Sequence, residues 1–62
     1  MEIFERVVGE GSVRVETAED LKSSFLRLVE LCMAKPGDYF AYDDQQARIV
    51  AEVSCYRPPY LM

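Results

Sequence analysis

Two cysteines and a set of carboxylates are the residues of this chain whose types could support chemistry. Its 62 residues include Cys32, Cys55 and eleven acidic residues, but no histidine. Without histidine, acid–base catalysis near neutral pH lacks its usual group, and two isolated thiols are too few for a four-ligand zinc site. A nucleophilic cysteine needs exposure and an activating base, and both cysteines fall at positions predicted to be buried. The sequence therefore predicts no enzyme, no cofactor and no metal site.

The two cysteines are predicted to be small, buried, reduced hydrophobic residues. Cys32 falls on the apolar face of a predicted helix, and Cys55 continues the apolar face of the last predicted strand. A disulfide between them is geometrically feasible if that helix packs on that strand. We nevertheless expect free thiols, because the chain is predicted to act in a reducing cytoplasm, where disulfides are rare.

The strongest local signal predicts a helix from about Ala18 to Ala34. The run Thr17–Asp20 is typical of a capping box, and Lys35–Gly37 is typical of a helix end. At helical spacing, one stripe of apolar side chains predicts the core-facing side: Leu21, Phe25, Leu28, Val29, Leu31 and Cys32. Leu26 and Met33 fall beside this stripe, where they either widen the core contact or extend a partner-binding surface.

Strand-like runs flank this helix in two pairs, and each pair has the pattern of a β-hairpin. The predicted strands are residues 2–8 with 12–16, and residues 38–42 with 47–56. The order ββαββ predicts one α+β domain over residues 1–62. We expect two layers, with an antiparallel sheet of about four strands and the helix packed on one face.

The last predicted strand assigns its side chains to two faces by simple alternation. The apolar face is predicted to hold Ile49, Ala51, Val53 and Cys55. The other face is predicted to hold Arg48, Val50, Glu52, Ser54 and Tyr56. Pro58 and Pro59 end this strand because proline cannot donate to a β-ladder.

The sheet face away from the helix is the first candidate binding surface, because one helix covers only one face. Two parities are open for the first and third strands. This face shows either Ile3, Glu5 and Val7 or Phe4, Arg6 and Val8, together with either Tyr39 and Ala41 or Phe40 and Tyr42. Each combination mixes apolar or aromatic side chains with charged ones, as protein interfaces do. The occupant is a protein partner, the apolar tail at residues 60–62, or a second copy of the chain.

Acidic residues of the second hairpin are the other candidate site. Asp43 and Asp44 fall at its tip, where paired carboxylates can enter an arginine or lysine pocket of a partner. The alternative is that these residues only form the turn by accepting hydrogen bonds from their own backbone. The partner-binding residues predicted from the sequence are Asp38, Tyr39, Asp43, Asp44, Glu52 and Tyr56.

The charge balance indicates the kind of partner. The net charge is −4, and the seven basic residues are scattered along the chain. Direct binding of nucleic acid needs clustered lysine and arginine, so a basic protein partner is favoured instead, unless the charge serves only solubility. Residues 1–6 lack the features of a secretory signal, and no run approaches the length of a membrane span. We therefore expect a cytoplasmic protein that contacts no membrane.

In its small size, acidity and lack of histidine, the whole chain resembles the phage-encoded anti-CRISPR inhibitors of type I effector complexes. The resemblance rests on overall character and assigns no role to a single residue. It implies a stoichiometric inhibitor that acts in the host cytoplasm on a basic subunit of a nucleoprotein complex, by acidic mimicry of DNA or by blocking a movement. The alternative is a structural or accessory module that homodimerises through its open sheet face.

Overall fold

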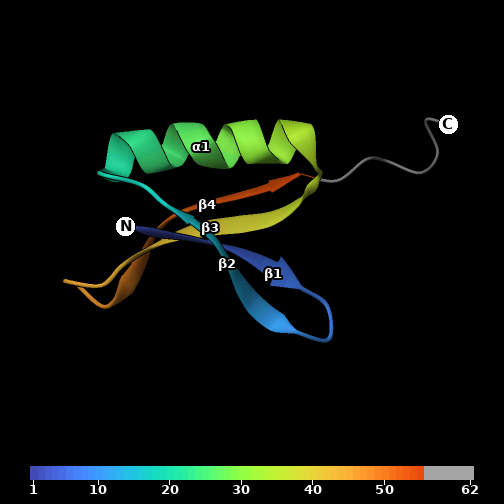
Figure 1. Cartoon of the computed structure of the whole chain (residues 1–62), viewed down its shortest axis with the longest axis horizontal. Helices are drawn as coiled ribbons and strands as arrows, with labels where there is room; N and C mark the ends of the chain where they lie inside the picture. Colours follow the sequence, from blue (N-terminus) through green and yellow to red (C-terminus); the bar gives the residue numbers. More distant parts are fainter. Residues whose placement is uncertain (56–62) are drawn as a thin grey trace, which may run out of the picture.

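A computed structural model describes residues 1–55 and confirms the predicted α+β fold. The elements in chain order are β1 (Glu2–Val7), β2 (Gly11–Thr17), α1 (Leu21–Ala34), β3 (Gly37–Asp43) and β4 (Arg48–Cys55). The four strands form one antiparallel sheet in the order β2-β1-β3-β4, and α1 lies across one face of it (Figure 1). The predicted positions of Tyr56 and of the tail at residues 60–62 lie outside the described residues.

Pairing of β1 with β3 joins the two hairpins and fixes which side chains face α1. Ile3 is opposite Ala41 in this ladder, and Phe4 is opposite Phe40. Ile3 and Ala41 are both fully buried against the helix. Because side chains alternate along a strand, Phe4 and Phe40 lie on the opposite face of the sheet.

The helix begins three residues later than the capping-box pattern predicts. Asp20 is its N-cap, and its Oδ1 atom accepts a hydrogen bond of 2.8 Å from the Ser23 backbone. Thr17 instead ends β2, because Ala18 exchanges backbone hydrogen bonds of 2.7 and 2.8 Å with Met1. These bonds extend the β1–β2 ladder and delay the start of the helix. The predicted end at Ala34 is confirmed.

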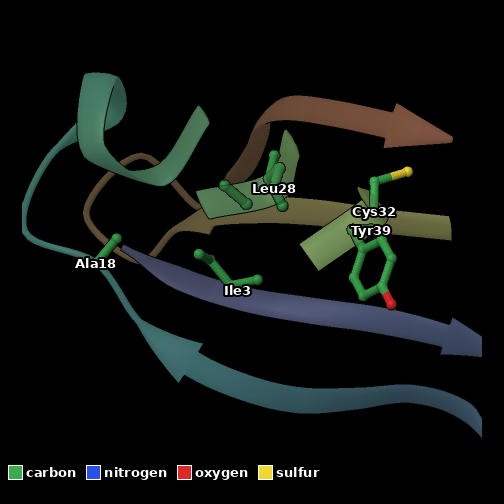
Figure 2. Packing of buried hydrophobic residues seen from close by; sticks show 6 residues of the cluster. Ile3, Ala18, Leu28, Cys32 and Tyr39 are labelled. Carbon is green, nitrogen blue, oxygen red and sulfur yellow. The ribbon is translucent and has the colours of Figure 1, made fainter. Parts of the chain in front are cut away.

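The core lies between α1 and the strands β1, β3 and β4, as Figure 2 shows. Its buried members are Ile3, Ala18, Leu28, Cys32, Tyr39 and Ala41. The helix contributes a narrower stripe than predicted, since Leu21 and Phe25 are 47% and 49% exposed. Ser24 takes a core-facing position instead and satisfies its hydroxyl with a 2.7 Å hydrogen bond to the carbonyl of Leu21. Three positions at four-residue spacing, 24, 28 and 32, are therefore the fully buried positions of α1.

A disulfide joins Cys32 to Cys55, which corrects the prediction of free thiols. The two Cα atoms are 6.1 Å apart, because the last turn of α1 packs beside the end of β4. The prediction relied on an assumed reducing compartment, whereas the fold brings the side chains together whatever the compartment. The predicted burial is confirmed for Cys32, which is 4% exposed.

An ion pair ties the edge strand β2 to the helix. Arg27 donates from Nε and Nη2 to the two carboxylate oxygens of Glu16, both at 2.8 Å. These hydrogen bonds are the main reason that the pKa of Glu16 lies below its ordinary value of 4.5. The charged form of Glu16 is thus favoured in the folded protein.

This ion pair predicts an acid-sensitive contribution to stability. A carboxylate whose pKa is lowered by folding stabilises the fold above its unfolded pKa, and that contribution is lost as the pH falls through the folded pKa. We expect the thermal midpoint to fall as the pH is lowered from about 5 through 4.5 and below. The Glu16→Gln variant should show a shallower pH dependence in circular dichroism melts. The matched variant Glu10→Gln, at the exposed β1–β2 turn, should keep the wild-type slope, and an equal change in both would contradict the prediction.

Candidate protein-binding face

The face of the sheet away from α1, here called the open face, is a grid set by the strand registers. It has three rows that each cross β2, β1, β3 and β4 in turn. The rows are Thr17, Glu2, Tyr42 and Ile49; then Arg14, Phe4, Phe40 and Glu52; then Ser12, Arg6, Asp38 and Ser54. No other described element covers this face, since α1 packs on the other side (Figure 1).

Aromatic side chains form the centre of the open face. The rings of Phe4 and Phe40 stack with centroids 5.2 Å apart and planes 12° apart. The Arg6 guanidinium lies 4.6 Å from the centroid of the Phe40 ring, in cation–π contact. Both phenylalanines, together with Tyr42, Ile49 and Ser12, line a shallow hollow of about 340 Å³. The centre is therefore apolar and concave.

Charged side chains surround this aromatic centre in pairs of opposite sign. Arg6 lies 2.9 Å from Glu52 and 4.0 Å from Asp38, measured between guanidinium nitrogen and carboxylate oxygen. The guanidinium of Arg14 lies 3.0 Å from the carboxylate of Glu2. Asp38 also accepts a hydrogen bond from the hydroxyl of Ser54. Each carboxylate of the open face thus has an arginine beside it. Three carboxylates share two arginines, and this paired pattern differs from the bare negative surface that a DNA mimic would present.

A β-bulge moves three residues of β4 to faces opposite to those predicted, namely Arg48, Ile49 and Val50. The register shifts between Ala41 and Tyr42, so that Ile49 is opposite Tyr42 on the open face. Val50 is the extra residue and packs against the core instead. The predicted faces of Ala51 and Val53 are correct, because the register is regular beyond the bulge.

The predicted site residues separate into different parts of the molecule. Asp38 and Glu52 lie together on the open face, both beside Arg6. Tyr39 does not belong to this face: it lies under α1, is 2% exposed, and donates a 2.7 Å hydrogen bond to the carbonyl of Lys35. Burial raises the pKa of its hydroxyl. Phe40 and Tyr42 take its place on the open face.

Asp43 and Asp44 lie at the β3–β4 turn, outside the open face. The Oδ1 atom of Asp43 accepts backbone hydrogen bonds from Gln45 at 2.9 Å and Gln46 at 3.4 Å, as the turn-forming alternative requires. Asp44 is exposed beside it, and both line a separate small hollow with Glu19. The turn geometry thus accounts for Asp43 without a partner.

A second apolar surface lies on the flank of α1. Leu26 and Met33 are 55% and 81% exposed, so they do not widen the core contact. The half-exposed Leu21 and Phe25 belong to the same helix. The same helix also carries an ion pair of 2.7 Å between Arg27 and Glu30.

The described residues hold neither a metal-ligand cluster nor a membrane-spanning helix. No group of three or more histidine, cysteine, aspartate or glutamate side chains within residues 1–55 is placed to hold a metal ion. The single described helix is neither long nor apolar enough to cross a membrane.

Comparisons with protein-family models, with curated proteins and with solved structures find no match to this chain.

Proposed function

We propose that this chain is a non-catalytic protein-binding module and that the open face is its binding surface. The observation that supports this is the stacked pair Phe4 and Phe40, flanked by Tyr42 and Ile49 and surrounded by charged pairs. An aromatic, water-excluding centre inside a polar rim is the anatomy of protein interfaces. Ile49 is 41% exposed in the isolated chain, so part of this centre is available to a partner.

More specifically, we propose that the chain is a phage-encoded inhibitor that binds a host nucleic-acid-binding complex, such as a CRISPR effector, at fixed stoichiometry. The resemblance in size and character and the net charge of −4 support a basic target. The paired carboxylates of the open face favour steric blocking over acidic mimicry of DNA. The inhibitor would occupy a subunit surface and prevent its movement or its access to DNA.

A titration of a type I effector complex tests this proposal. Wild-type protein should abolish target-DNA binding at a fixed molar ratio to one subunit. Ile49→Arg places an unpaired charge in the centre of the open face and should weaken inhibition about tenfold or more. Met33→Arg makes the same change on the more exposed helix flank and should inhibit like wild type. Equal inhibition by all three proteins would show that the open face is not the binding surface. No inhibition by wild type would show that the effector complex is not the target.

The second candidate function is a structural or accessory module that homodimerises through the same face. One specific observation favours it, namely the order of charges along the rows of the open face. In this form the aromatic centre would be covered without a foreign partner.

A further inference from the structure

We infer that the open face binds the open face of a second copy, so that two chains form a four-layer sandwich with both helices outside. The inference rests on the second candidate function, the homodimerising module, and it names a second copy as the occupant of the open face in place of an effector subunit. It follows from the order of residues in the rows.

The central row is self-complementary when it is reversed. Across the sheet it runs from Arg14 through Phe4 and Phe40 to Glu52. A two-fold axis parallel to the strands, between β1 and β3, reverses this order in the second copy. Arg14 then lies opposite Glu52 of the second copy, and Phe4 lies opposite Phe40 of the second copy. Both ends of the row gain an opposite charge. Phe4 of one copy lies over Arg6 and Phe40 of the other, since Arg6 lies over the Phe40 ring, which is 7% exposed.

The neighbouring rows agree with the same axis. In the row of Ser12, Arg6, Asp38 and Ser54, reversal places Arg6 opposite Asp38 of the second copy. In the remaining row, Glu2 lies opposite the hydroxyl-bearing Tyr42. No row places like charges opposite each other, which is the requirement for a self-complementary interface.

Charge disfavours a two-fold axis that runs across the strands through the central row. Such an axis would place Arg14 opposite Arg14 and Glu52 opposite Glu52, which is repulsive at both edges. The favoured axis keeps the strands of the two sheets nearly aligned, as in the common packing of sheets within about 30° of each other.

The size of the face predicts a moderate affinity. Four strands at a spacing of about 4.8 Å and three rows at about 6.8 Å give a flat footprint of about 400 Å² on each copy. Side chains protrude from the sheet, so the surface buried on each copy is larger than its flat footprint. The total buried area of the two copies is therefore near the lower limit of about 1,000 Å² for specific interfaces. We therefore expect dissociation in the micromolar range. The side chains of Arg14 and Glu52 are 65% and 55% exposed, so their new ion pairs form at the rim and select orientation more than strength.

Sedimentation equilibrium of the whole chain tests the inference. Between about 10 μM and 1 mM, a range chosen to bracket a micromolar dissociation constant, wild type should change from monomer to dimer. Arg14→Glu alone and Glu52→Arg alone should each weaken the dimer about tenfold or more, because each places two like-charge pairs across the interface. An equimolar mixture of the two variants should recover a one-to-one heterodimer, since both contacts then join opposite charges.

Matched controls separate the interface from net charge and folding. Lys22→Glu and Asp44→Arg make the same changes in net charge at exposed positions away from the open face, and both should dimerise like wild type. Each reversal also loses a partner within its own chain, Glu2 for Arg14 and Arg6 for Glu52. Recovery on mixing cannot come from restored folding, because mixing repairs no contact within a chain.

The outcomes distinguish this inference from the proposed function. A wild type that stays monomeric throughout, or two variants that fail to associate on mixing, would overturn the dimer. If wild type is monomeric while Ile49→Arg still weakens effector inhibition, the inference fails and the proposed function stands. If wild type is monomeric and inhibits nothing, both fail.

Discussion

Replacing Leu28 with alanine is expected to lower the free energy of unfolding by about 2–5 kcal/mol, measured by urea denaturation. Leu28 is fully buried at the centre of the helix–sheet contact (Figure 2). The truncation removes apolar burial and leaves a cavity that the surrounding core fills only in part. A domain of this size has a total stability of only a few kcal/mol, so the variant should be partly unfolded at room temperature.

A matched truncation on the same helix provides the control. Leu26→Ala removes the same atoms from a side chain that is 55% exposed, and it should cost less than about 1 kcal/mol. If Leu26→Ala destabilised the protein as much as Leu28→Ala, the helix would be packed through a different face.

Removing the disulfide should have an effect of similar size. We expect the double variant Cys32→Ala/Cys55→Ala to lose about 3 kcal/mol, because the bond closes a loop with a sequence separation of 23 and restricts the unfolded chain. The measurement is urea denaturation of wild type and variant, each with and without a thiol reductant. The mutation and the reductant each remove the same bond, so the two measurements can be compared directly.

The reductant serves as the internal control for this prediction. Wild type should fall to nearly the stability of the double variant when it is reduced, whereas the double variant should not respond. A wild type whose denaturation midpoint is unchanged by reductant would contradict a stabilising disulfide.

The fold class could be predicted from the sequence because its signals are local. The end of the helix before Pro36 and the alternation of Ala51 and Val53 each depend on a few neighbouring residues. The start of the helix could not be fixed in this way. Thr17 and Asp20 are both good N-caps, and the choice between them depends on the pairing of Ala18 with Met1.

The candidate site was only partly predictable, because it depends on long-range pairing. Tyr39 and Phe40 are adjacent aromatic residues, so alternation alone cannot say which one faces the helix. The β1–β3 register decides it by placing Phe40 beside Phe4. The bulge that brings Ile49 to the open face contains no glycine or proline, so the sequence does not indicate it. Glu52 was found through the alternation of the last strand, and Asp38 was found as an acidic residue of the second hairpin.

The position of β1 inside the sheet has a consequence for synthesis of the chain. β1 leaves the ribosome before β3 and lies between β2 and β3, so its second edge stays unpaired until residues 37–43 have emerged. The nascent β1–β2 hairpin therefore presents Ile3 and Phe4 beside a free backbone edge, which is the kind of edge that recruits other chains. Translation speed between residues 17 and 43 should then govern how much newly made protein aggregates.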